Sequence, residues 1–307
     1  METGCKRIQR PVKKIGIDYF HCRERFLALP GVREVRKGPY RFAVSPGPAQ
    51  DYLAEHFSEA DALIRDGAHA KVSWASSASI WTLPGGKRVF VKRNRVHGFE
   101  YTFKYFFIPA RAFRAAMSAQ RVEAAGIMTP RVLAAGEKRF AHFLLAGYLV
   151  TDAVEDAQDL MAFTERSPEA PAQMPSVIAE AARITAALHG HGFYHGDLKL
   201  VNLYRTGNDS RFGVWDLDSA QLFDGEVPRE LVVRELGRIA SSILIFAEKN
   251  PAFPDAFFDL GAVTEALLGA YASNGGTPPA ANEVEDMART RWLNKRKLRF
   301  DYGGRQQ

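Results

Sequence analysis

The spacing of apolar and polar positions changes character part-way along the chain. In the first half, short apolar runs near turn residues predict strands, and these runs cover residues 71–75, 79–83, 88–93 and 140–151. Apolar residues recur at helical spacing over residues 50–64 and 110–125, and the second stretch follows Pro109 and ends before Gly126. Antiparallel strands with a helix among them predict a small α+β lobe.

Helical periodicity dominates the second half. Residues 177–188 are rich in alanine and carry one apolar face, and further helices are predicted over 230–247, over 256–272 and in the basic last segment. Residues 164–175 and 274–279 are rich in proline, glycine or polar side chains, so they are predicted to be loops. This half is therefore expected to form a mainly helical lobe.

These patterns divide the chain into three expected parts. Residues 1–41 have no sustained period and are interpreted as an irregular, basic extension. The sheet-containing lobe is expected over residues 42–151 and the helical lobe over residues 152–307. The predicted fold class is therefore α+β, with a small antiparallel sheet in the first lobe and helices in the second.

Composition narrows the class of protein. The chain has 307 residues, of which 46% are hydrophobic and 25% charged, as is usual for a soluble globular protein. Two cysteines, Cys5 and Cys22, cannot staple a fold of this size, which favours a reducing compartment. The sequence has no apolar run of the roughly 18 residues needed to cross a bilayer. A cytoplasmic location is expected, with peripheral contact to the inner face of the membrane as an extension of it.

The positive charge is concentrated at the two ends of the chain. The net charge is +6, yet residues 1–41 hold eleven Lys/Arg against four Asp/Glu, and residues 288–307 hold seven against one. Basic ends can attract nucleic acid, anionic lipid or phosphorylated glycans, and they can equally be plain solvated ends. Charge alone does not choose the partner, and a nucleic-acid role has no other support in the sequence.

The most informative motif lies between two predicted helices. Residues 195–202 read His-Gly-Asp-Leu-Lys-Leu-Val-Asn, and Asp216 follows fourteen residues after Asn202 in an apolar setting. An Asp, an Asn five residues later and a second Asp beyond a hairpin suit phosphoryl transfer. One carboxylate accepts the proton of the attacking hydroxyl, while carboxylate and amide oxygens hold magnesium, a hard ion.

This motif resembles the catalytic loop of the protein-kinase-like superfamily, with Gly196 where protein kinases carry arginine. The His-Gly-Asp form is similar to aminoglycoside and choline kinases and to bacterial lipopolysaccharide kinases of the Kdo/heptose type. Residues 215–218, Trp-Asp-Leu-Asp, look closest to the lipopolysaccharide kinases. Val-Phe-Val-Lys at 89–92 and Ala-Ala-Gly-Ile-Met-Thr-Pro at 124–130 extend the resemblance over about residues 70–247. It implies a two-lobed, protein-kinase-like fold.

The resemblance also implies a role for each matching residue. Asp197 would be the catalytic base, Lys199 would touch the transferring phosphate, and Asn202 and Asp216 would bind Mg²⁺. The remaining positions would bind ATP: Lys92 at the α/β phosphates, Ser76 and Ser77 in the phosphate loop, and Asp152 and Val154 in the hinge beside adenine.

Two positions depart from the kinase pattern. The phosphate loop reads Ala-Ser-Ser-Ala at 75–78 instead of a glycine-rich sequence, so its hydroxyls would replace part of the usual backbone cradle. The helix that should supply a glutamate to the lysine has no acid over residues 113–119, although Glu100 and Glu123 flank it. Either another carboxylate pairs with Lys92, or the nucleotide alone holds this lysine.

The acceptor is expected to be small or sugar-like. Only about thirteen residues separate Asp216 from the next predicted helix, and no Ala-Pro-Glu element follows, so the chain lacks the longer peptide platform of protein kinases. The prediction is transfer of the ATP γ-phosphate to a heptose or Kdo hydroxyl of the lipopolysaccharide inner core. The basic ends would attract an anionic membrane surface.

Three alternatives remain open at this point. A compact protein Ser/Thr/Tyr kinase would use the same motifs, and a pseudokinase would bind nucleotide without turnover, as the missing helix glutamate allows. The third alternative is a zinc site, because His189, His191 and His195 are closely spaced. Gly190 and Gly192 make that arrangement loose, which favours a His- and Gly-rich turn instead.

Overall fold

The computed structural model describes residues 21–66, 68–72, 76–96, 105–207 and 211–303. Contacts divide these residues into two compact units. The sheet unit comprises residues 21–162 and Val201–Ala220, and the helical unit comprises Phe163–Leu200 and residues 221–303. The sequence pattern places a single boundary at residues 151–152, whereas the structure returns a later segment to the sheet unit.

Helices and strands alternate in the first half, and helices dominate the second. The strands are β1 (Arg33–Lys37), β2 (Tyr40–Val44), β3 (Ala68–Val72), β4 (Ser76–Thr82), β5 (Arg88–Arg95), β6 (Val132–Phe140), β7 (Phe143–Asp152), β8 (Ala157–Asp159), β9 (Phe193–Tyr194), β10 (Leu203–Thr206), β11 (Arg211–Val214) and β12 (Gln221–Leu222). The α-helices are α1 (Cys22–Leu27), α2 (Gln50–His56), α3 (Ala60–Asp66), α5 (Arg111–Ala124), α6 (Leu160–Arg166), α7 (Ala170–Gly190), α8 (Arg229–Ala247), α9 (Leu260–Ser273) and α10 (Ala281–Gly303). Short 3₁₀ turns are η1 (Phe57–Glu59), η2 (Leu200–Asn202), η3 (Leu217–Ser219) and η4 (Asp255–Phe258).

Seven of these strands form one antiparallel sheet in the order β1-β2-β6-β7-β5-β4-β3. β5 is an interior strand between β7 and β4: Lys92 lies opposite Ala78 of β4 and Leu149 of β7. The expected strands over 79–83, 88–93 and 140–151 therefore exist. The one expected over 71–75 lies partly outside the described residues.

One face of the sheet packs against α2, η1 and α3. Tyr148 of β7 points to this face, where its ring lies 5.5 Å from that of Phe42 and its hydroxyl donates to Asp61 of α3 at 2.6 Å. Val91 of β5 belongs to the same core. The single helix expected over residues 50–64 is thus divided into α2, η1 and α3.

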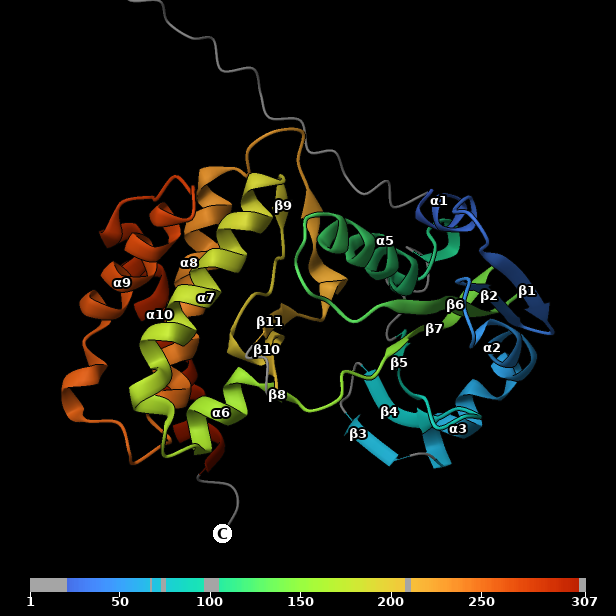
Figure 1. The fold of residues 1–307 in the computed structure, drawn as a ribbon, viewed down its shortest axis with the longest axis horizontal. Coiled ribbons are helices and arrows are strands. Elements are labelled where there is room, and N and C mark those ends of the chain that lie inside the picture. The colour runs from blue at the N-terminus through green and yellow to red at the C-terminus, as the bar shows by residue number, and fades with distance from the viewer. Residues whose placement is uncertain (1–20, 67, 73–75, 97–104, 208–210, 304–307) are drawn as a thin grey trace, which may run out of the picture. The chain divides into compact units, whose positions relative to one another are not determined.

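The opposite face packs against α5 (Figure 1). Gly147 of β7 faces this side of the sheet. A Cβ added at Gly147 would lie 3.0 Å from Cβ of Ala110, the residue just before α5. Neighbouring residues of a strand point to opposite faces, so Lys92 points away from the core that holds Val91 and toward the α5 side.

The expectation of an irregular segment up to residue 41 is wrong for its described part. β1 and β2 form an edge of the seven-stranded sheet, with Arg36 opposite Arg41. In α1, Phe26 is fully buried and packs edge-on against Phe113 of α5 at 6.4 Å. Polar and basic residues dominate this segment, so its few buried apolar residues show no regular spacing in the sequence. Residues 1–20 lie outside the described part.

Four helices, α7 to α10, make up most of the helical unit, with α7 packed on α9 and α8 on α10. The loop expected over residues 164–175 is also wrong, because α7 already begins at Ala170 and contains Pro175. Ala170 and Met174 are fully buried, so packing offsets the cost of a proline near the start of this helix. Within the described residues, no helix is both long enough and apolar enough to cross a membrane.

Candidate active site

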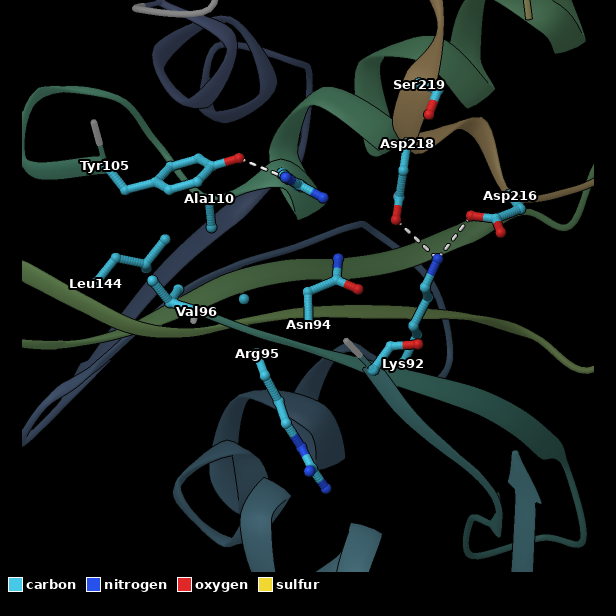
Figure 2. A pocket seen from close by; sticks show the side chains of 13 residues that line it. Lys92, Asn94, Arg95, Val96, Tyr105, Ala110, Leu144, Asp216, Asp218 and Ser219 are labelled. Carbon is cyan, nitrogen blue, oxygen red and sulfur yellow. Dashed lines mark hydrogen bonds and ion pairs between the residues drawn. The ribbon is translucent and has the colours of Figure 1, made fainter. Parts of the chain in front are cut away.

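Lys92 is the centre of an ion-paired cluster in the sheet unit. Its Nζ lies 2.6 Å from Oδ1 of Asp216 and 2.7 Å from Oδ2 of Asp218 (Figure 2). The lysine side chain is only 16% exposed. Burial by itself lowers the pKa of Lys92, but the two carboxylates more than offset this effect, and the pKa is raised above its ordinary value. The lysine therefore remains charged.

The backbone at the Asp-x-Asp segment turns both carboxylates toward this lysine. Asp216 has a φ of 62°, in the left-handed region that few residues other than glycine adopt. The chain then enters η3, which contains Asp218. Arg114 of α5 donates a hydrogen bond to the backbone carbonyl of Asp218. The helix therefore contributes an arginine to this segment, and the acid that pairs with the lysine comes from the segment itself.

Two supports hold the hairpin that carries Asp216. The loop after α5 reaches it, because the amide of Val214 donates to the carbonyl of Met128 at 2.9 Å. A Cβ on Gly213 would lie 2.6 Å from that same carbonyl oxygen, so only glycine allows this approach. At the open end of β10–β11, the amide of Trp215 donates to the carbonyl of Asn202 at 3.1 Å. The predicted magnesium ligands Asn202 and Asp216 therefore lie at the same end of one hairpin.

A cavity of about 310 Å³ opens beside the ion-paired cluster. Most of its lining residues come from β4, β5, β7, α5 and the Asp-x-Asp segment, among them Ser76, Lys92, Asn94, Arg111, Asp216 and Asp218. Tyr105, which precedes α5, also lines it (Figure 2). Ser77, the other predicted phosphate-loop hydroxyl, is buried and accepts a hydrogen bond from Arg95 at 2.8 Å. The structure therefore brings Ser76, but not Ser77, to the cavity wall.

The predicted hinge residues are not among those that line this cavity. The carboxylate of Asp152 pairs with Lys87 at 2.7 Å, and its amide donates to the carbonyl of Arg131 at 2.9 Å. The amide of Ala153 donates to the carbonyl of Arg88 at 3.2 Å. Binding of adenine by backbone groups of Asp152 and Val154 stays a prediction.

Residues 195–200 of the predicted catalytic loop lie in the helical unit and are held by a buried glutamate of α8. The carboxylate of Glu235 accepts hydrogen bonds from the amides of His195 (3.1 Å) and Gly196 (2.8 Å) and from Nε2 of His189 (3.1 Å). Burial raises the pKa of Glu235. The hydrogen bonds and the nearby histidines lower the pKa by more than burial raises it, so the pKa lies below its ordinary value. Gly196 has a φ of 82°, which glycine adopts without strain.

Asp197 projects from this anchored loop and is 35% exposed. Nζ of Lys199 lies 2.9 Å from its Oδ2, and Nε of Arg238 lies 3.9 Å from its Oδ1. Arg238 also donates a hydrogen bond to the carbonyl of Gly196. Asp197, the predicted base, and Lys199, which is predicted to touch the transferring phosphate, are therefore together in one unit.

The three histidines each have a different protein partner. His189 bonds to Tyr271 (2.9 Å) and Glu235, the ring of His191 bonds to the carbonyl of Ala187 (2.8 Å), and Nδ1 of His195 accepts from the amide of Asp197 (3.3 Å). In the part of the chain that the structure describes, no three His, Cys, Asp or Glu side chains are placed to hold a metal. A zinc site is therefore not supported.

Comparison with known proteins identifies the family. The sequence matches the lipopolysaccharide kinase (Kdo/WaaP) family over residues 71–256, more than half of the chain. The chain belongs to this family. Its members are kinases, so the protein is a phosphotransferase, as the motifs predict. A search of curated proteins found no significant match.

The chain is also similar to solved structures. The structure of WaaP in complex with acyl carrier protein matches with a TM-score of 0.55 and 20% identity, covering 85% of this chain and 99% of WaaP. A double mutant of the PknI kinase domain of Mycobacterium tuberculosis matches with a TM-score of 0.44 and 17% identity, covering 73% and 93% of the two chains. The WaaP match confirms the protein-kinase-like fold expected from the sequence.

The lipopolysaccharide kinase motifs leave two residues of the site without a role. Asp218 was visible as the second acid of Asp-x-Asp, but nothing in the sequence showed that it would reach Lys92. Glu235 lies in an ordinary helical pattern of the sequence, and only the structure shows that it is buried and bonded to the loop. Glu123 lies near Asp152 and Arg131 instead, and Glu100 is outside the described residues.

We expect Lys92→Met to lower phosphotransfer by about 100-fold or more, because the site loses its cation and Asp216 and Asp218 face each other uncompensated. Initial rates of ATP-dependent transfer, measured on protein whose melting temperature is also recorded, check this. Lys249→Met, which removes an ion pair with Glu165 away from the proposed site, is the matched control and should retain activity. Equal rates for both variants would contradict the role of Lys92.

We expect Glu235→Gln to destabilise the protein by about 2–3 kcal/mol at pH 7, because the buried charge-assisted bonds to His189 and the loop amides weaken. A carboxyl group whose pKa is lowered in the folded state stabilises the fold at pH values above its ordinary pKa, which is 4.5 for glutamate. This stabilisation is lost as the pH falls through the lowered pKa. Urea unfolding at pH 7 and pH 4 should therefore show a smaller pH dependence for Glu235→Gln.

Glu180→Gln is the control for this experiment, since Glu180 forms an exposed pair with Arg183. That variant should change the free energy of unfolding by less than about 0.5 kcal/mol. If the two variants behave alike, Glu235 does not anchor the loop.

Proposed function

We propose that this lipopolysaccharide kinase family member transfers the γ-phosphate of ATP to a heptose or Kdo hydroxyl of the lipopolysaccharide inner core. The observation that carries the proposal is the anchored loop, which begins with a buried His195 and presents Asp197 with Lys199 at 2.9 Å. Asp197 would accept the proton of the attacking hydroxyl, as a positioned base does in phosphoryl transfer. The acceptor oxygen then bonds to the γ-phosphorus while the bond to the ADP oxygen breaks.

The residues for magnesium fit the chemistry of that ion. Asn202 and Asp216 offer an amide and a carboxylate oxygen at the open end of β10–β11, and Asp216 is 39% exposed. Oδ1 of Asp218 is buried and has no hydrogen-bond partner among the described residues, which makes it a third oxygen donor in the same segment. When bound, Mg²⁺ supplies charge neutralisation at the phosphate oxygens. Lys92 would hold α/β-phosphate oxygens, with Ser76 beside it.

The structure removes one argument for a pseudokinase. That alternative rested on the missing helix glutamate, and Asp218 and Asp216 supply the counter-charge of Lys92 instead. A short segment between Asp216 and α8 supports a sugar over a peptide acceptor, as the sequence indicates. We therefore retain the sugar kinase as the proposed function.

We expect purified protein to phosphorylate core oligosaccharide with ATP and Mg²⁺, seen by mass spectrometry as the addition of one phosphoryl group to heptose or Kdo. Asp197→Asn should lower the transfer rate by about 10²–10⁴-fold, because the base is lost, while nucleotide still binds. Asp224→Asn, an exposed acid in the same unit, is the control and should be fully active.

Several outcomes would contradict this assignment. Labelling of peptides but not of oligosaccharide would indicate a protein kinase. Stabilisation by ATP that is equal in wild type and Asp197→Asn, without transfer by either, would indicate a pseudokinase. An unchanged transfer rate in Asp197→Asn would exclude it as the base.

We also propose that the tip of the β6–β7 hairpin contacts the membrane surface. Phe140 is 74% and Phe143 45% exposed there, and Phe143 packs with Phe106, whose neighbour Phe107 is 67% exposed. Exposed aromatic residues in one patch are unusual on a protein that remains in water and suit an interfacial contact. The same expectation came from the two basic ends of the chain, of which residues 1–20 and 304–307 lie outside the described part.

We expect the double variant Phe140→Ser/Phe143→Ser to bind vesicles about tenfold more weakly than wild type, because less apolar area enters the interface. Sedimentation with vesicles of phosphatidylglycerol and phosphatidylcholine measures the partitioning. Leu293→Ser, at an apolar position of α10 that is as exposed as Phe143, is the control. Binding that is unaffected by the double variant would exclude the hairpin as the contact.

A further inference from the structure

Positive charge gathers around Asp197 in the helical unit. Besides Lys199 at 2.9 Å, Asp197 has Nε of Arg238 at 3.9 Å. The Arg238 side chain is 12% exposed, and its Nε is buried without a hydrogen-bond partner in the described part of the chain. One carboxylate thus faces two cations, one of which retains an unused donor.

A second arginine of α8 extends this positive surface. Arg234 lies one turn before Arg238, and residues four apart on a helix share a face. Arg234 is hydrogen-bonded to the side chain of Tyr194, the residue just before the catalytic loop. It is exposed, so its remaining donors can reach a ligand.

The last helix adds a third arginine because α10 lies very close to α8. A Cβ on Gly237 would lie 2.6 Å from Cγ of Met287 and 3.1 Å from the carbonyl oxygen of Val284, so only glycine allows this approach. Arg291 lies one turn after Met287 and follows the same face. The close helix contact therefore brings Arg291 toward Arg238.

The charges around Arg291 are consistent with this placement. Burial lowers the pKa of Arg291, the neighbouring positive charges of Arg238 and Arg234 lower it further, and Asp197 opposes them. Glu235, which lies on α8 between Arg234 and Arg238, is already engaged by His189 and the loop amides. Three guanidinium groups close together are repulsive unless an anion neutralises them.

We propose that Arg234, Arg238 and Arg291 form an anion subsite beside Asp197 that binds a carboxylate or phosphate group of the acceptor. The inference rests on the proposed function, since it takes Asp197 as the group that faces the acceptor hydroxyl. Guanidinium forks bind both anions with paired hydrogen bonds. The residues proposed for the nucleotide phosphates, Lys92 and Ser76, belong to the sheet unit. An acidic sugar thus fits this surface better than a neutral one.

Steady-state kinetics with core oligosaccharide test the subsite. Arg291→Gln should raise KM for the oligosaccharide about tenfold or more, with kcat and KM for ATP nearly unchanged, because uniform binding of the acceptor is lost. Arg289→Gln removes the same charge from an exposed position of α10 and should match wild type. A rise in KM for ATP instead, or equal KM values in the two variants, would overturn the proposal.

Modified acceptors distinguish the two sources of the anion. Carboxyl-reduced oligosaccharide and dephosphorylated oligosaccharide are compared with the intact acceptor for wild type and Arg291→Gln. The acceptor that lacks the recognised group should show a raised KM with wild type and no further rise with Arg291→Gln. If both modified acceptors retain the KM of the intact one, no acceptor anion binds here and the proposal fails.

A binding experiment separates this proposal from the proposed function. Wild-type protein is treated with phenylglyoxal, which modifies arginine, in inorganic phosphate or in chloride of equal ionic strength. Mass spectrometry should show that phosphate protects Arg291 and Arg234 but not Arg289. If no sugar is phosphorylated and protection is still observed, the subsite stands without the sugar kinase function; equal modification in both salts overturns the subsite.

Discussion

The ion-paired cluster of Lys92, Asp216 and Asp218 is the interaction on which the sheet unit's site depends. An amine in a nearly buried position must have counter-charge, and both partners here come from one short segment. A single contact between β5 and η3 therefore positions the lysine and two acids together. Arg114 secures the same segment from α5, so the helix acts on the cluster through the backbone. The left-handed conformation of Asp216 is maintained by these surroundings.

In the helical unit, the predicted catalytic loop is held in place while the carboxylate of Asp197 is left available. The carboxylate of Glu235 accepts hydrogen bonds from two backbone amides of the loop. The turn at Gly196 is therefore held by a group that is itself fully buried. Ser242 accepts the amide of Leu200 at the other end of the loop (3.1 Å). Because the backbone carries these anchors, the carboxylate of Asp197 remains partly exposed and near Lys199. Rigidity of the loop and accessibility of the acid are thus compatible.

The lipopolysaccharide kinase family and its fold could be predicted from the sequence, because the chemistry-bearing residues lie in short ordered motifs. The motif of His-Gly-Asp, an Asn five residues later and Asp-x-Asp can be recognised from its spacing in the sequence, without knowledge of how the chain packs. Helix positions over 110–125, 230–247 and 256–272 also followed from periodicity, since these helices bury one face. Glycine at 126 marked the end of α5 correctly, with a φ of 73°.

Only tertiary structure decided how distant segments complete the site. The sequence pattern did not predict that β1 and β2 pair at the edge of the sheet, because charged residues occupy the exposed positions of β1. Asp218 meets Lys92 across 126 residues of sequence, and Glu235 meets Gly196 across 39. Such pairs carry no local signal, since the free energy that brings them together comes from packing the elements between them. The sequence alone thus predicts which groups do the chemistry, and packing determines which neighbours hold them in place.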